Sequence, residues 1–339
     1  MVRPSAGDSG RMFSEVFAFI EDLDLALGEG CGLPRMCYDK IIVCGMGGSA
    51  IGGDIMQQSI GTLSKIPMKV NRFPSLPSWA DENTLVVASS YSGNTKETLI
   101  MYDSALEHGC KLVSMTTGGK LQEVSERDGV PVVRMAPGMQ PRSALGKSLG
   151  HLANILDSTG GIGCIEEFRN ALPKLYRLRD KLAKGDMAWN IAKGIGGRVP
   201  VIYSTNTLYS TAIRWKTQIN ENSKTMAFAG SVPDFNHNEV AGWAEEGVDG
   251  MFCPIFLFEE NAHREVRRAM RASIDMVKSY GVSPMVVKVT GKTITERLLT
   301  SVMIGDFVSL SLAADNDVDP ESVASINEFK SDLSRRLAE

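Results

Sequence analysis

Short apolar runs alternate with amphipathic segments along most of this chain, and that alternation constrains its fold more than any other feature. In the first half the runs predict five strands, at residues 40–45, 66–70, 84–90, 111–116 and 130–135. Helical segments lie between them, for example at 49–60 and 95–109. Such an order is typical of a mostly parallel, doubly wound sheet with helices on both faces.

The same alternation returns in the second half, after a stretch without a strong strand. We predict further strands at 199–204, 248–258 and 284–290, and helices at 208–222, 263–281 and 295–314. A chain of 339 residues has the length of two ordinary domains. We therefore expect a lead-in and helix at 1–35, a first α/β unit at 36–150, a helical connection at 151–195, and a second unit with C-terminal helices at 196–339.

Composition excludes several classes of partner. The formal net charge is −4 and no long basic run occurs, which argues against nucleic acid and anionic membranes. No window approaches the roughly eighteen uninterrupted apolar residues of a membrane-spanning helix. The first twelve residues are polar, so we expect a frayed lead-in rather than a signal peptide. Six cysteines without a CxxC pair and only four histidines favour reduced thiols in the cytoplasm and no metal site.

The first loop whose residues could bind a ligand is GMGGSAIGGD, at residues 45–54, between a predicted strand and a predicted helix. Gly47 and Gly48 let the backbone approach a ligand, and the helix start offers unpaired N–H groups to an anion. Ser49 adds a hydroxyl at that place. A tight turn in which Ser49 is only the N-cap explains the same residues.

A dinucleotide site is a second alternative, because Gly45-x-Gly47-x-x-Ala50 fits the looser form of that fingerprint. Such a site expects an acidic residue at the end of the next strand. The chain has Val70-Asn71-Arg72 there and no acid. Because Arg72 could bind a 2′-phosphate, NADP stays open.

The second loop, SYSGNT at residues 90–95, also joins a predicted strand to a predicted helix. It places four polar side chains in one turn: Ser90, Ser92, Asn94 and Thr95. A capping pair of Asn94 with Glu97 would explain only one of these four. The carboxyl ends of strands are where doubly wound sheets bind ligands. Hydroxyls and backbone N–H groups suit an exchangeable monoester phosphate, and the missing Gly-Lys-Ser/Thr of a P-loop disfavours nucleotide hydrolysis.

At these two loops the chain resembles sugar isomerase (SIS) domain proteins. Three further motifs, QPRSALG (140–146), NENSK (220–224) and NHNEVAGW (236–243), resemble the bifunctional phosphoglucose/phosphomannose isomerase family, best known from archaea. All five occur in that family's order. The resemblance implies two SIS-type doubly wound domains, a homodimer, and interconversion of glucose 6-phosphate or mannose 6-phosphate with fructose 6-phosphate through a cis-enediolate, without metal or another cofactor.

The resemblance also implies roles for particular residues. The phosphate ligands would be Gly47, Gly48, Ser49, Ser90, Ser92 and Thr95. Glu221 would be the catalytic base, Arg142 would face the reacting carbons, and His237 would open the sugar ring from the neighbouring subunit. The family's lysine near the C-terminus has no counterpart within residues 309–320, where Ser309, Ser311 and Asn316 are the polar candidates.

Each catalytic residue also has a plainer interpretation. Glu221 is one of 40 acidic residues and could lie on a solvated face. Arg142 could form a surface ion pair, and His237 could hydrogen-bond Asn236, Asn238 or Glu239. Two other functions also stay open, a non-enzymatic sugar-phosphate sensor and an isomerase of another (amino) sugar phosphate. The sensor is disfavoured because the N-terminal segment carries no basic stripe for a DNA-binding module.

Overall fold

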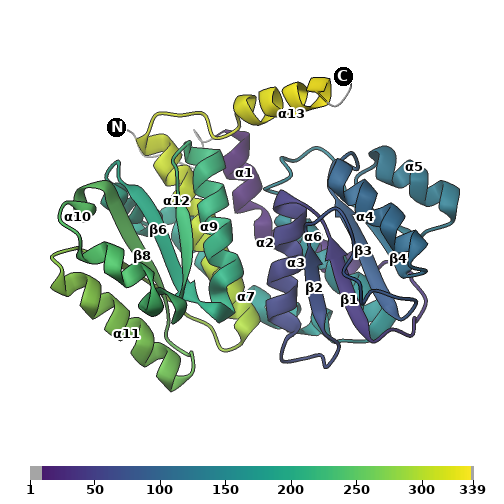
Figure 1. The fold of residues 1–339 in the computed structure, drawn as a ribbon, viewed down its shortest axis with the longest axis horizontal. Helices are drawn as coiled ribbons and strands as arrows, with labels where there is room; N and C mark the ends of the chain where they lie inside the picture. Colours follow the sequence, from purple (N-terminus) through teal and green to yellow (C-terminus); the bar gives the residue numbers. More distant parts are fainter. Residues whose placement is uncertain (1–9, 337–339) are drawn as a thin grey trace.

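The computed structural model describes residues 10–336, which form two α/β units side by side (Figure 1). Residues 1–9, most of the expected lead-in, lie outside the described residues. The chain enters through α1 (Arg11–Phe17) and α2 (Phe19–Glu29), which together occupy the predicted N-terminal helix. It then builds the first unit, drawn on the right of Figure 1.

The first unit is a five-stranded sheet whose strands all run parallel. Its order is β2-β1-β3-β4-β5. The strands are β1 (Lys40–Cys44), β2 (Met68–Asn71), β3 (Thr84–Ser90), β4 (Lys111–Thr116) and β5 (Val132–Arg134), and the helices between them are α3 (Gly47–Ile60), α4 (Lys96–Glu107) and α5 (Gly119–Asp128).

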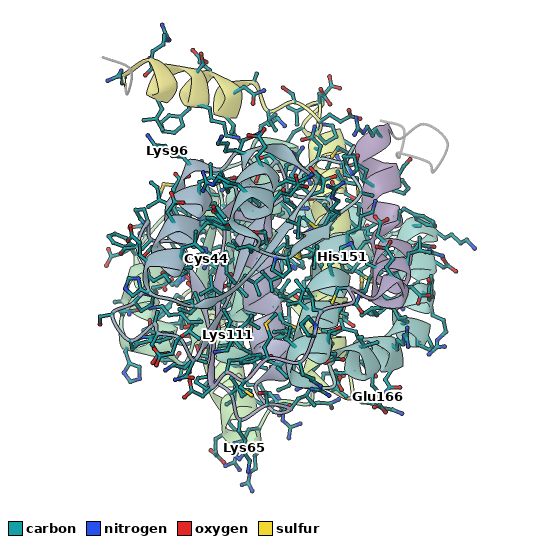
Figure 2. All side chains as sticks on the ribbon, turned by 90° about the vertical axis from the view of Figure 1, so that its right-hand side faces the viewer. Cys44, Lys65, Lys96, Lys111, His151 and Glu166 are labelled. Carbon is teal, nitrogen blue, oxygen red and sulfur yellow. The ribbon has the colours of Figure 1, made fainter. Side chains whose placement is uncertain are left out.

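Both faces of this sheet are buried, as parallel sheets require. Along β1, Ile41 and Val43 join one hydrophobic cluster, whereas Ile42 and Cys44 join another on the opposite face. Cys44 is fully buried, whereas Lys65 and Lys96 lie at the periphery of the molecule (Figure 2). Burial raises the pKa of the Cys44 thiol to about 12, so this cysteine packs as a small apolar residue.

The second unit has a four-stranded parallel sheet in the order β7-β6-β8-β9. Its strands are β6 (Val199–Thr205), β7 (Phe228–Val232), β8 (Phe252–Glu259) and β9 (Met285–Val289). The predicted strand at 248–258 begins only at Phe252, because Val248–Met251 forms the short helix α10. The remaining elements of this unit are η1 (Asn206–Leu208), α9 (Tyr209–Ser223), η2 (Asp234–His237), η3 (Glu239–Ala244), α11 (Arg264–Ser279), α12 (Ile294–Asp315) and α13 (Ala324–Arg336).

A layer of helices joins the two units. It includes α6 (Leu145–Gly160), α7 (Cys164–Lys184) and α8 (Met187–Ile195). One hydrophobic cluster contains Ile41 of the first sheet and Ile255 of the second, so the units share a core. By length and composition α12 could span a membrane, but 83% of its apolar window is buried inside the protein.

Helix α9 is held tightly against α12, which fixes the position of its C-terminal end. At Gly305 of α12 a Cβ atom would lie 2.4 Å from the Trp215 ring, so a larger residue would push the helices apart. The Trp215 indole is fully buried and donates a hydrogen bond to the Ser301 carbonyl at 2.8 Å. The end of α9 carries residues 220–224, one of the motifs noted in the sequence.

Candidate functional site

The two hydroxyl-rich loops lie next to each other, at the carboxyl ends of β1 and β3. The strand order reverses between these two strands, which is where doubly wound sheets form a ligand-binding crevice. The Tyr91 N–H donates to Ser49 Oγ at 3.3 Å and so connects the second loop to the first. The structure thus brings together the residues expected to bind phosphate.

The second loop is folded so that its hydroxyl groups converge. Ser90 Oγ donates to Thr95 Oγ1 at 2.9 Å and accepts from the Gly93 N–H at 3.1 Å. Gly93 has φ +69°, and a Cβ atom there would lie 1.7 Å from the Gly118 carbonyl oxygen, so only glycine fits. Ser92 is exposed, and its Oγ accepts from the Asn94 N–H at 3.2 Å.

The capping pair of Asn94 with Glu97 is absent from this loop. Thr95 is the residue that precedes α4. Asn94 Oδ1 instead accepts from the Lys120 N–H at 3.0 Å, and its Nδ2 donates to the Ser92 carbonyl at 3.1 Å. Asn94 therefore braces the loop against the start of α5.

In the first loop, helix α3 begins earlier than Ser49. Its N-cap is Met46, so the interpretation of Ser49 as the N-cap is wrong. Gly48 packs against the next motif, since a Cβ atom there would lie 2.8 Å from the Pro141 carbonyl oxygen. Arg72, which a dinucleotide phosphate would need, forms an ion pair with Asp54 of α3.

Arg142 is buried between the two units, so its interpretation as a surface ion pair is wrong. Its Nε donates to Asn222 Oδ1 at 2.8 Å and its Nη2 to the Pro320 carbonyl at 2.6 Å. Its Nη1 lies 3.6 Å from Glu221 Oε2. Burial lowers the pKa of the Arg142 guanidinium, while the charge of Glu221 opposes that shift.

Glu221 lies in the last turn of α9, and its side chain is 32% exposed. It therefore does not stand on a fully solvated face. It reaches solvent on one side and the buried Arg142 on the other. Glu221 is thus a partly exposed carboxylate next to a fixed, buried cation.

Lys224 lies three residues after Glu221 and was not singled out from the sequence. It adopts a left-handed conformation, with φ +56°, that turns its side chain back over the end of α9. Its Nζ donates to the Glu221 carbonyl at 2.5 Å and to the Ser322 carbonyl at 2.9 Å. Burial lowers the pKa of Lys224, and the nearby positive charge of Arg142 lowers it further.

The segment after α12 closes one side of this arrangement. Asn316 Nδ2 donates to the Ser223 carbonyl at 3.1 Å and to Thr225 Oγ1 at 2.9 Å. Together with Lys224, this anchors residues 316–322 across the end of α9 and holds the Pro320 carbonyl against Arg142. Apart from their place in NENSK and the segment at 309–320, no sequence signal indicated Asn222, Lys224 or Pro320.

His237 lies apart from the other expected catalytic residues. It is exposed at the end of η2, beyond the edge strand β7. Within residues 10–336 no hydrogen bond or ion pair involves its side chain, so the expected bond to Asn236, Asn238 or Glu239 is not formed. Asn236 accepts from Ser273 Oγ, and Glu239 accepts from the Tyr203 hydroxyl.

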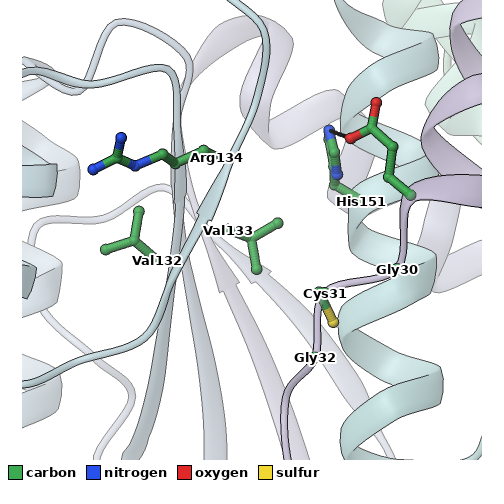
Figure 3. A pocket seen from close by; sticks show the side chains of 8 residues that line it. Gly30, Cys31, Gly32, Val132, Val133, Arg134 and His151 are labelled. Atoms are coloured by element: carbon green, nitrogen blue, oxygen red, sulfur yellow. Dashed lines mark ion pairs between the residues drawn. The ribbon is translucent and has the colours of Figure 1, made fainter.

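A hollow of about 340 Å³ lies beside the edge strand β5 (Figure 3). His151 lines it, with Nε2 3.6 Å from Glu29 Oε2 and Nδ1 without a partner among the described residues. Burial lowers the pKa of His151. Throughout residues 10–336, no group of three or more His, Cys, Asp or Glu side chains has the arrangement of a metal site.

Comparison with known proteins gives matches over nearly the whole chain. Residues 184–333 match the family model described as the bacterial phospho-glucose isomerase C-terminal SIS domain. A bifunctional phosphoglucose/phosphomannose isomerase of Caldicellulosiruptor bescii is 35% identical over 336 residues, covering 95% of this chain and 98% of that protein. A D-glucosamine-6-phosphate 4-epimerase of Sulfolobus acidocaldarius is 33% identical over 221 residues, covering 65% of this chain and 68% of that protein.

Solved structures with low sequence identity share the fold. The C-terminal domain of glucosamine-fructose-6-phosphate aminotransferase from Francisella tularensis superposes with a TM-score of 0.75 at 14% identity, covering 94% of this chain and all of that one. Tagatose-6-phosphate ketose/aldose isomerase from Escherichia coli gives a TM-score of 0.69 at 15% identity, covering 95% and 98%. The predicted fold class, two SIS-type doubly wound domains, is confirmed.

Proposed function

We propose that this chain, which belongs to the bifunctional phosphoglucose/phosphomannose isomerase family, interconverts glucose 6-phosphate and mannose 6-phosphate with fructose 6-phosphate. The observation that carries the proposal is the position of Glu221, 3.6 Å from the buried Arg142. The Arg142 segment in turn packs on Gly48 of the first hydroxyl loop. A base, a cation and an anion-binding loop are the three parts that aldose–ketose isomerisation needs.

The two loops would bind the phosphate group of the sugar. The ligands are the backbone and hydroxyls of Gly47, Gly48, Ser49, Ser90, Ser92 and Thr95. Helices α3 and α4 both begin at these loops, and helix N-termini attract anions through unpaired N–H groups. Hydroxyls and amides without a directly bound cation hold a monoester phosphate firmly enough for recognition and loosely enough for release.

Glu221 would move the proton between the two carbons. It takes the proton from C2 of the open-chain aldose, the electron pair shifts into the C1 carbonyl, and a cis-enediolate results. The C2 hydroxyl proton then passes to O1, and return of the carbon-bound proton to C1 gives the ketose. Arg142 would stabilise the enediolate, and a fixed guanidinium supplies that charge without a metal or cofactor.

We also propose a cytoplasmic homodimer in which His237 of the partner subunit opens the sugar ring. An exposed, unbonded histidine on one chain, away from that chain's own Arg142 and Glu221, suits this role. Histidine side chains commonly act as general acids and bases in catalysis. Co-expression of Glu221→Gln and His237→Ala subunits tests the arrangement, because mixed dimers then contain one intact site. Activity no higher than in either single variant would exclude it.

The direct test of the function is conversion of fructose 6-phosphate by the purified protein in the presence of EDTA. Glu221→Gln removes the base but keeps the shape of the side chain. We expect kcat to fall by about 10²-fold or more with KM nearly unchanged, as for loss of a general base. Glu245→Gln, at an exposed glutamate, is the matched control. Full activity of Glu221→Gln would remove Glu221 from the mechanism.

Two alternatives remain as outcomes of this assay. Binding of hexose phosphates without turnover would indicate a sensor. Turnover of an amino-sugar phosphate alone would place the chain nearer to the activity named for its Sulfolobus relative.

A further inference from the structure

Arg142 differs from the buried arginines of the second unit, Arg214 and Arg297, in how its charge is balanced. Arg214 makes two bonds to the buried carboxylate of Asp306, at 3.0 and 2.7 Å. Arg297 pairs with the buried Glu259 at 2.5 Å. Arg142 is equally buried, yet its short bonds go to a side-chain amide and a backbone carbonyl, and Glu221 lies at 3.6 Å.

A buried charge is normally compensated by a close opposite charge, because removing it from water is costly. For Arg142 the direct contacts are neutral oxygen atoms and the Met12 sulfur. The negative charges that act on it, Glu221 first and then Glu15 and Asp319, form no hydrogen bond with it, and Glu221 lies at 3.6 Å. Part of the positive charge is therefore left to act on a ligand that binds beside Glu221.

The neutral contact at Nε comes from Asn222, whose orientation is itself fixed. Asn222 is fully buried and follows Glu221 directly. Its Nδ2 donates to Ser309 Oγ at 2.9 Å. Ser309 uses its own hydroxyl proton on the Asp306 carbonyl at 2.7 Å, so it can only accept from Asn222. The amide oxygen of Asn222 is thereby directed at Arg142.

The backbone of Arg142 is held by the same group of residues. Its carbonyl accepts from Arg214 Nη2 at 3.1 Å, and Arg214 is the arginine paired with Asp306. Asn222 and Arg214 of α9 thus hold the side chain and the backbone of Arg142, and both residues are fixed in turn by bonds to α12.

We infer that Asn222 is a positioning residue that orients the Arg142 guanidinium through a neutral acceptor and so keeps its positive charge available to the enediolate. The inference rests on the proposed function of Arg142. A carboxylate at position 222 would still accept from Arg142 Nε, although it would lose the donor to Ser309, and it would pair with the guanidinium charge as Asp306 does with Arg214. The chemistry therefore requires an amide here and not an acid.

Asn222→Asp tests this directly, because it preserves size and the bond to Nε. We expect kcat for fructose 6-phosphate to fall about tenfold or more with KM nearly unchanged, less than the loss of a whole oxyanion donor because the guanidinium stays in place. Asn206→Asp, at an exposed asparagine before the other end of α9, controls for the added charge and should match the wild type.

A binding measurement separates this inference from the proposed function. 5-Phosphoarabinonate carries a carboxylate where the enediolate would form, and glucitol 6-phosphate is uncharged there. By calorimetry, Asn222→Asp should weaken binding of the carboxylate at least tenfold and leave that of the alditol unchanged. A purely structural role of Asn222 would weaken both equally or neither, and either result overturns the inference even if the wild type is a fully active isomerase.

If Asn222→Asp does not fold, Ser309→Ala decides the matter. It removes the acceptor of Asn222 Nδ2 without touching Arg142, so the amide can turn. We expect a severalfold lower kcat and the same selective loss of carboxylate affinity. Unchanged kcat and affinities would refute the inference.

Discussion

A methyl group added at Gly48 would separate the first phosphate loop from the segment that carries Arg142. The new Cβ atom would lie 2.8 Å from the Pro141 carbonyl oxygen and 3.4 Å from the Arg142 Cα. Ordinary van der Waals contact begins near 3.4 Å, so the loop and the Pro141 carbonyl have to part by the difference from 2.8 Å, about 0.6 Å. Both neighbours are backbone, which cannot turn aside as a flexible side chain can.

The shift changes the distance between the bound phosphate and the guanidinium that faces the reacting carbons. A misplacement of about 1 Å can cost about 10²-fold in rate, so a shift of about 0.6 Å predicts roughly a tenfold loss. We expect Gly48→Ala to lower kcat/KM for fructose 6-phosphate by that factor, in an assay coupled to glucose-6-phosphate dehydrogenase.

Gly52→Ala is the matched control in the same helix. There the nearest atom to the added Cβ, in Ser148, lies at 3.6 Å, which is ordinary contact. Replacing glycine in a helix interior by alanine adds about 0.5–1 kcal/mol of stability, so this variant should unfold at higher temperature and keep its activity. Wild-type kcat/KM in Gly48→Ala would refute the claim that this contact sets the geometry of the site.

Two predictions concern stability. Asp306→Asn leaves the buried Arg214 without its counter-charge and should lower the free energy of unfolding in urea by about 3–5 kcal/mol; a loss below about 1 kcal/mol would show that the pair is not needed. Burial lowers the pKa of His151 in the folded state, so the unfolded chain binds more protons below about pH 6.5 and stability falls as the pH drops through that window. His151→Gln should reduce this fall between pH 7.5 and 5.5, and an identical fall in wild type and variant would assign it to other groups.

The strands that could be predicted are those whose buried runs are long and apolar, such as TLVVASS in β3, where prediction and structure coincide. Strand β7 was missed because FAGSV is short and contains glycine and serine, and its place at the sheet edge tolerates them. Helix α5 was missed because GKLQEVSERD is mostly polar and packs only one narrow apolar face.

The candidate site divides in the same way. Ser49, Ser90 and Thr95 could be found because they lie at or just after the carboxyl ends of strands, where such sheets bind ligands. The contacts of Arg142 could not, because Asn222 and Pro320 lie 80 and 178 residues further along the chain. Sequence spacing says nothing about which distant segments meet, so the neutral environment of this buried arginine emerges only from the tertiary structure.

The most direct measurement of the central claim is incubation of fructose 6-phosphate with the purified protein in deuterium oxide, followed by NMR of the products. Proton transfer through an enediolate at Glu221 predicts both glucose 6-phosphate and mannose 6-phosphate, with solvent deuterium at C2 of each. Absence of both aldoses, or their formation without any deuterium at C2 or in the recovered ketose at C1, would contradict it.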